Sequence, residues 1–152
     1  MSVPPNPHLV GTSLLFIIPA TMNAAYRQWL LYSVSMLMCL ASSIWHATKY
    51  PPLLIIDQAA CYVLASTNVY YSIKYKVSFI PILASLYCIM VFHCGYLTNS
   101  FIFAENKVES LGWHMSMHLV VVSAISCNAI QIHAVACKKL ILDKTQTNAT
   151  DP

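Results

Sequence analysis

The chain alternates long apolar runs with short polar or proline-containing breaks. Five of the runs are long enough for a membrane helix, which needs about 20 apolar residues to cross a bilayer core, with a range of about 17 to 25. The pattern therefore predicts an all-α fold, a polytopic integral membrane bundle of about five transmembrane helices. The expected helices cover residues 9–25, 29–47, 53–71, 77–98 and 113–137, and a polar tail covers 138–152.

The breaks between the runs contain residues that end helices. Arg27 marks the first turn, and Lys49-Tyr50-Pro51-Pro52 forms the second, where proline lacks an amide donor and restricts the residue before it. Pro19 lies inside the first run, and a packed membrane helix tolerates such a proline. No linker divides the chain, so residues 1–152 are expected to form a single transmembrane domain.

Composition supports a membrane location and argues against several other classes. Of the 152 residues, 58% are hydrophobic and 9% are charged, whereas a soluble domain usually carries about 25% charged residues. The net charge of +3 comes from single or paired basic residues, so no nucleic-acid partner is expected. The six cysteines lie in apolar runs without a CxxC pair, which predicts neither a disulfide framework nor a thiolate metal site.

Lysine and arginine are distributed unevenly between the two ends of the predicted bundle. The end that carries the N-terminus holds Lys49 and Lys107, and the opposite end holds six such residues. Because cytoplasmic loops are enriched in lysine and arginine, we expect a non-cytoplasmic N-terminus and a cytoplasmic C-terminus. The six residues are Arg27, Lys74, Lys76, Lys138, Lys139 and Lys144.

Five polar residues interrupt the apolar runs at the same end of the membrane. Ser42 and His46 are four residues apart on one face at the end of the second helix, and Asp57 lies about one turn into the third. His114 and His118 are four residues apart at the start of the fifth helix. The second helix ends on the side where the third and fifth begin, so all five residues are expected at similar depth.

These residue types suit metal-assisted hydrolysis. Three neutral imidazoles commonly hold zinc and leave a fourth position for water, whose pKa the metal lowers toward neutrality. We therefore expect His46, His114 and His118 to be ligands of Zn²⁺. Asp57 would accept the proton of the water and later deliver it to the leaving group, and Ser42 would orient a ligand or donate to the developing oxyanion.

The motifs resemble those of the CREST superfamily of membrane hydrolases, which includes alkaline ceramidases, progestin/adiponectin receptors and lipases that remodel GPI anchors. That superfamily shows Ser-x3-His late in its second helix, Asp early in its third, and His-x3-His at the start of its last. The step from His46 to Asp57, within WHATKYPPLLIIDQ, is most similar to that of the alkaline ceramidases. The resemblance implies a zinc-dependent hydrolase in which Asp57 positions the water. It also implies a membrane-lipid substrate, ceramide-like, with an amide or ester bond reached from within the bilayer.

The chain departs from this family in three respects. The family core has seven helices and this chain has length for five, although the loss of two helices after Asp57 keeps the motifs on one side. The alkaline ceramidases carry an acidic N-terminal segment that looks calcium-binding, whereas no Asp or Glu precedes Asp57 here, so that cation is not carried over to this chain. Gln58 stands where an acidic residue often follows the aspartate.

Other interpretations of the same residues remain open. A membrane histidine is often satisfied by hydrogen bonds between helices, and Ser42 belongs equally to a small-residue packing face. His93, near the same end of the fourth helix, is an alternative ligand. The alternative function is a non-catalytic protein, receptor-like or structural, that keeps the zinc site as a staple between helices. A five-helix frame either closes its own chamber or needs a second copy or a partner subunit.

Overall fold

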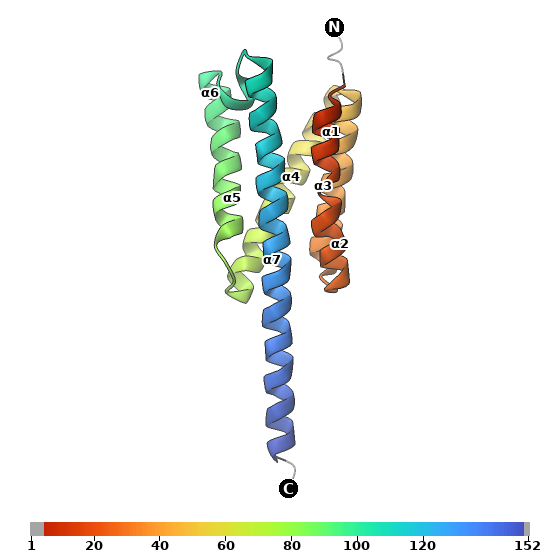
Figure 1. Ribbon diagram of the computed structural model, residues 1–152, viewed down its shortest axis with the longest axis vertical. Helices are drawn as coiled ribbons and strands as arrows, with labels where there is room; N and C mark the ends of the chain where they lie inside the picture. The colour runs from red at the N-terminus through yellow and green to blue at the C-terminus, as the bar shows by residue number, and fades with distance from the viewer. Residues whose placement is uncertain (1–4, 151–152) are drawn as a thin grey trace.

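The computed structural model describes residues 5–150, which form helices and short connections with no strand. Five helical segments are long and apolar enough to cross a membrane, so the predicted all-α bundle is confirmed (Figure 1). The elements are α1 (Pro7–Leu14), α2 (Ile17–Ala25), α3 (Trp29–Thr48), α4 (Pro51–Tyr75), α5 (Ile80–Ile89), a π-helical turn (Met90–Cys94), α6 (Gly95–Thr98), a 3₁₀ turn (Phe101–Phe103) and α7 (Lys107–Thr150).

The first predicted helix is broken into α1 and α2. Pro19 has no amide hydrogen, and its ring clashes with the carbonyl four residues earlier, which belongs to Leu15. The chain tightens here, and the Leu15 carbonyl accepts a hydrogen bond from the amide of Ile18 at 3.0 Å instead. The break separates α1, at the end of the bundle where the histidines lie, from α2.

Tight turns connect the first four membrane segments. Arg27, Lys49 and Lys76 follow α2, α3 and α4, and each adopts a left-handed backbone conformation with φ between 50° and 58°. A residue in this conformation commonly ends a helix by turning the chain so that the last carbonyls are satisfied. Pro51 occupies the first position of α4, where its missing amide hydrogen costs nothing. These turns keep the end of α3 and the start of α4 together.

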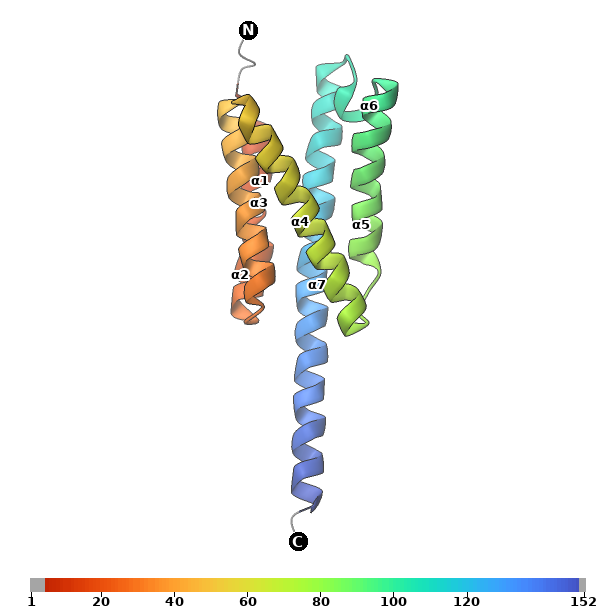
Figure 2. The same cartoon turned by 180° about the vertical axis from the view of Figure 1, so that it is seen from behind.

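The helices pack side by side with one member inclined. The α1–α2 segment packs along α3, and α5 packs along α7. From behind, α4 crosses the bundle diagonally, from α3 at its N-terminal end toward α5 at its C-terminal end (Figure 2). The two chain ends lie at opposite ends of the bundle, as an odd number of crossings requires.

Helix α7 is longer than the sequence pattern predicted. We expected a helix over 113–137 and then a polar tail, whereas α7 continues to Thr150. The segment Lys107–Leu142 alone has 36 residues, which at a rise of 1.5 Å per residue is about 54 Å, against a bilayer core of about 30 Å. The C-terminal part of α7 therefore extends well beyond the other helices (Figure 2). Residues 151–152 of the predicted tail lie outside the described residues.

The distribution of side chains suits a lipid environment. Large apolar side chains such as Ile55, Ile73 and Leu83 are more than half exposed on the outside of the bundle. Small and polar side chains lie inside, where helix–helix hydrogen bonds replace the hydrophobic effect as a source of specificity. The best-satisfied group joins α4 to α7: Asn128 accepts a hydrogen bond from Ser72 and donates one to the side-chain oxygen of Asn68, both at 3.1 Å.

Substitution of Asn128 by alanine removes the three hydrogen bonds that its side chain makes to α4, one from Ser72 and two to Asn68. We expect a destabilisation of about 0.6 to 1.7 kcal/mol, from the mean to the maximum measured for a hydrogen bond between membrane helices. Unfolding by SDS in mixed micelles measures this difference. The matched control is Ser126→Ala, since Ser126 donates to the Val122 carbonyl within α7 itself. If the two variants lose equal amounts of unfolding free energy, the hydrogen bonds between Asn128 and α4 have no special role in stability.

Candidate metal centre

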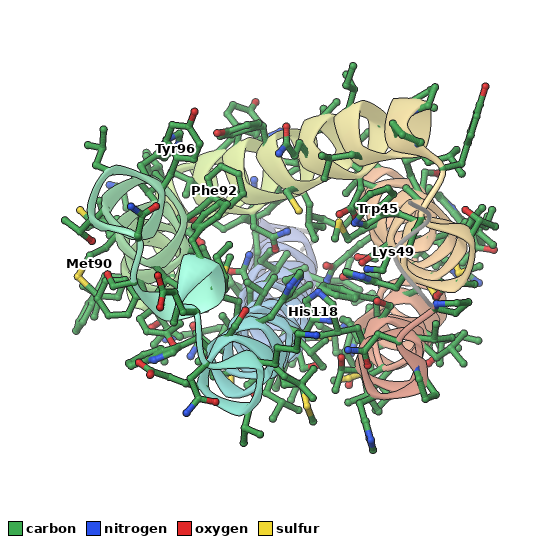
Figure 3. All side chains as sticks on the ribbon, turned by 90° about the horizontal axis from the view of Figure 1, so that it is seen from above. Trp45, Lys49, Met90, Phe92, Tyr96 and His118 are labelled. Carbon is green, nitrogen blue, oxygen red and sulfur yellow. The ribbon has the colours of Figure 1, made fainter. Side chains whose placement is uncertain are left out.

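Three histidines from two helices converge at the end of the bundle that carries the N-terminus. His46 lies in the last turn of α3, and His114 and His118 lie one turn apart near the start of α7. One ring nitrogen of each residue lies within 4.8 Å of those of the other two. From above, His118 points from α7 toward the side of the bundle that carries Trp45 and Lys49 (Figure 3). The three predicted ligands therefore form one group.

The group is suited to hold a metal ion. Nε2 of His46 is buried and has no hydrogen-bond partner in the protein, which is costly for a polar atom away from water. Nitrogens bound to one tetrahedral ion at about 2.0–2.1 Å lie roughly 3.3 Å apart. The nitrogens, now within 4.8 Å of one another, would have to move closer to reach this spacing. The imidazole donors suit a transition-metal ion such as zinc, copper, iron or nickel.

Asp57 lies beside this group on α4. The residue is 7% exposed, and its Oδ1 atom is buried without a hydrogen-bond partner. Nζ of Lys49, in the turn between α3 and α4, lies within hydrogen-bond distance of Nδ1 of His46, at 3.0 Å. Burial lowers the pKa of the Lys49 ammonium, and the Asp57 carboxylate partly opposes that effect. The carboxylate and the lysine thus lie on the α4 side of the histidine group.

Ser42 is fully buried one turn before His46 on α3. Its hydroxyl forms a hydrogen bond with the hydroxyl of Ser13 at 2.9 Å and also lies next to the carboxyl of Asp57. The structure thus brings all five predicted site residues together.

Two further residues of the site, Thr12 and Ser13, come from α1 and were missed in the sequence. The hydroxyl oxygen of Thr12 lies 2.9 Å from Nδ1 of His118. The start of α1 is tied to the site as well, because the amide of Asn6 donates to the carbonyl of His46 at 3.2 Å. A signal was present, since two adjacent hydroxyl residues interrupt the first apolar run at the same end of the membrane.

The remaining histidines lie elsewhere. Nε2 of His93 forms a hydrogen bond with the hydroxyl of Tyr62 at 3.0 Å, which joins the π-helical turn to α4. His133 stacks on Tyr26 with ring centroids 4.2 Å apart, and His8 is exposed at the start of α1. None of the three belongs to the histidine group, so the alternative assignment of His93 as a ligand is not supported.

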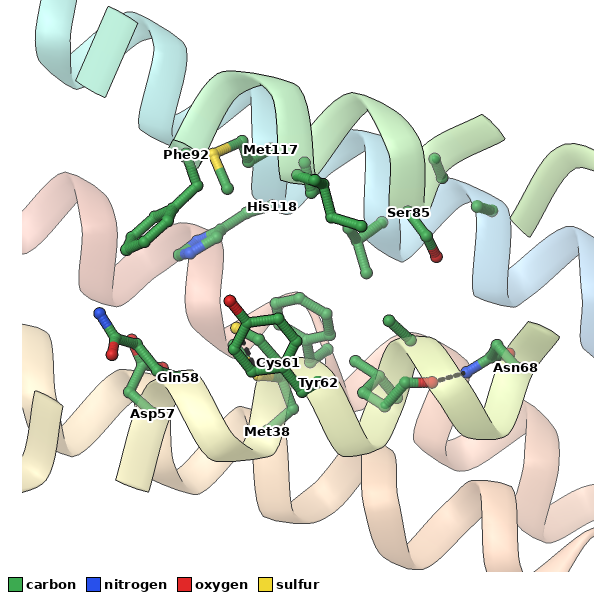
Figure 4. Close-up of a pocket in the computed structure, with 18 of the residues that line it drawn as sticks. Met38, Asp57, Gln58, Cys61, Tyr62, Asn68, Ser85, Phe92, Met117 and His118 are labelled. Atoms are coloured by element: carbon green, nitrogen blue, oxygen red, sulfur yellow. Dashed lines mark hydrogen bonds between the residues drawn. The ribbon is translucent and has the colours of Figure 1, made fainter. Parts of the chain in front are cut away.

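A cavity of about 170 Å³ opens beside the site between α4, α5 and α7. Asp57, His114 and His118 line it at one end, and Asn68 lines it at the other (Figure 4). Asp57 and Asn68 are eleven residues apart on α4, which corresponds to about 16 Å. Most of the lining between them is apolar, including Leu64 and Ile125. The histidine group therefore stands at the end of an elongated apolar cavity.

Removal of one histidine should abolish tight metal binding. We expect the wild-type chain to bind one Co²⁺ or Zn²⁺ ion, and His114→Ala to bind it more than about 100-fold less tightly, beyond the 10–100-fold typical of residues around a ligand. A competition titration with a chromophoric chelator measures both affinities. The control is His133→Ala, on the same helix about 28 Å from His114. A wild-type chain that binds no ion would contradict the assignment.

The gathered residues offer a defined chemistry. Three imidazoles can hold a metal ion, and a carboxylate with a free oxygen can accept or donate a proton. Both groups border the same apolar cavity. Comparison with protein families, curated proteins and solved structures found no match for this chain.

Proposed function

We propose that the protein is a zinc-dependent intramembrane hydrolase, ceramidase-like, that cleaves an amide or ester bond of a membrane lipid. One observation carries this proposal: three imidazoles and a buried carboxylate meet at one end of an apolar cavity among membrane-spanning helices. A lipid substrate would bring its polar bond to that end and its hydrocarbon into the cavity.

Among the ions that imidazole donors suit, zinc is the one proposed here. The group has three imidazoles and no thiolate, a set typical of zinc sites that keep a fourth position open. When bound, zinc supplies a Lewis acid that lowers the pKa of a coordinated water toward neutrality. His46 and the pair His114 and His118 would hold the ion from two different helices.

Asp57 is the proposed general base. Its Oδ1 atom is free of protein partners and the residue lines the cavity, so the carboxylate would accept a proton there and return it to the leaving group. The Ser42 hydroxyl, next to this carboxyl and held by Ser13, fixes the orientation of the carboxylate. The proposed role of Ser42 is therefore to position Asp57. Its second proposed role is to donate a hydrogen bond to the substrate oxygen.

The orientation proposed for the chain follows from the basic residues. Arg27, Lys74 and Lys76 lie at the end of the bundle opposite the histidines, Lys74 in the last turn of α4 and the other two in turns after α2 and α4. Helix α7 also emerges from this end. Since cytoplasmic loops are rich in lysine and arginine, that end is assigned to the cytoplasm. The metal centre is then near the non-cytoplasmic face, within reach of lipids of that leaflet.

The second candidate is a non-catalytic protein in which zinc staples α3 to α7. The observation that favours it is the origin of the ligands, because His46 and the His114/His118 pair come from helices far apart in the sequence. A staple needs neither a base nor a cavity. Asp57 and the apolar cavity are therefore the features that favour the hydrolase.

The Asp57→Asn variant separates the two candidates. We expect hydrolysis of a labelled ceramide, or of an ester lipid with the same label, to fall by at least about 100-fold, since general-base catalysis typically contributes 10²–10⁴-fold. The zinc content should stay at the wild-type value, because Asp57 is not a ligand. Hydrolysis is followed by release of labelled fatty acid from substrate in detergent micelles.

The control for this variant is Glu109→Gln, an exposed acid-to-amide change in the first turn of α7. It should hydrolyse the lipid at the wild-type rate. Wild-type protein that contains zinc but cleaves neither lipid would instead support the staple, provided that a chelator lowers its melting temperature.

A bulky residue in the cavity should block the substrate without disturbing the metal. Ala65 lines the cavity on α4 between Asp57 and Asn68, so Ala65→Phe should lower hydrolysis while zinc affinity stays unchanged. The control is Ala59→Phe, on the exposed face of the same helix. Equal activity of the two variants would show that the cavity does not hold the substrate.

A further inference from the structure

We propose that Thr12 is a positioning residue of the metal centre, whose hydroxyl holds the ring proton of His118 on Nδ1 and keeps Nε2 free for the ion. The inference rests on the metal centre proposed above. It assigns a role in the site to α1, a helix that contributes no ligand.

The contact is short and buried. Oγ1 of Thr12 lies 2.9 Å from Nδ1 of His118, and the two side chains are 8% and 6% exposed. The residues are 106 positions apart in the sequence, so the contact depends on how α1 packs against α7. Since lipid offers no hydrogen bonds, neither group has an alternative partner in the solvent.

The direction of the hydrogen bond follows from the tautomer that His118 must adopt to bind an ion through Nε2. A neutral imidazole that binds an ion through Nε2 carries its proton on Nδ1, and that N–H needs an acceptor. The oxygen of Thr12 is the acceptor at hand. The threonine hydroxyl then donates its own hydrogen to the carbonyl of Leu9, which lies 3.2 Å away. Both polar groups are satisfied in this arrangement.

The ring of His118 is also held from a second direction. Phe16, which follows the end of α1, meets the imidazole edge to face with ring centroids 5.8 Å apart. Phe16 is 2% exposed and belongs to the buried core of the bundle. Thr12 and Phe16 together fix both the proton and the plane of the ring.

Other residues keep α1 in place independently of Thr12. The side chain of Asn6 caps α1 by accepting from the amides of His8 and Leu9, and the amide of Asn6 donates to the carbonyl of His46. Ser13 adds a hydrogen bond to Ser42. Loss of the Thr12 hydroxyl should therefore change the metal centre without releasing the helix.

The test compares three threonine variants in the full-length protein, with Zn²⁺ alone as the probe. Thr12→Val keeps the shape of the side chain and removes the acceptor. We expect its zinc dissociation constant to rise about 10–100-fold, the range typical for loss of a ligand's hydrogen-bond partner. Thr12→Ser restores the hydroxyl and should restore the affinity. Thr21→Val is the control, because Thr21 makes the same kind of bond to its own helix, to the Ile18 carbonyl, away from the site.

The melting temperature of the metal-free proteins distinguishes positioning from a general structural effect. We expect it to be similar in wild type and Thr12→Val, whereas the rise on addition of zinc should be smaller in the variant. If Thr12→Val does not fold, Thr12→Ala takes its place with the same expectations.

The outcomes of this test bear separately on the role of Thr12 and on the metal centre. Equal zinc affinity of wild type and Thr12→Val contradicts the role of Thr12 but does not contradict the proposed metal centre. Failure of wild type itself to bind zinc overturns the proposed function and this inference with it. A loss of affinity in Thr12→Val that Thr12→Ser does not recover also contradicts the role of the hydroxyl.

Discussion

The satisfaction of buried polar groups is the constraint on which this bundle depends. Lipid cannot hydrogen-bond to a side chain. Each polar group inside the bundle therefore needs a hydrogen-bond partner in the protein or a bound ion or ligand. Asn68, Ser72 and Asn128 satisfy one another between α4 and α7. His46 and Asp57, by contrast, each keep a buried atom without a partner. Other unpaired groups occur, in Asn23 and Ser35, so the convergence of three imidazoles is what distinguishes the metal centre.

The inclination of α4 explains how a five-helix chain makes room beside this centre. At its N-terminal end α4 follows α3, which brings Asp57 to the histidines, and at its C-terminal end it meets α5. The cavity lies where α4 departs from α5, with α7 along its other side. Helix α1 also contacts the site, where Thr12 bonds to His118 and Ser13 bonds to Ser42.

Much of this organisation could be predicted from the sequence, because it depends on periodicity and parity. Apolar runs of membrane length gave the five segments, and the count of crossings placed Ser42, His46, Asp57 and the α7 histidines at one end. The contacts of Thr12 and Ser13 could not be predicted, because they depend on how α1 packs against α3 and α7. The length of α7 was also missed, since polar residues after 137 continue a helix as readily as they end one.

The origin of the three histidines has a consequence for assembly. His114 and His118 are neighbours on a single helix, so local secondary structure alone gives them a high effective concentration for one ion. His46 joins them only when α3 has docked. Metal binding by His114 and His118 alone would indicate that α7 has formed. Metal binding by all three histidines would indicate that α3 has also packed into the bundle. The affinity of the centre is therefore a measure of how completely the two halves of the chain have come together.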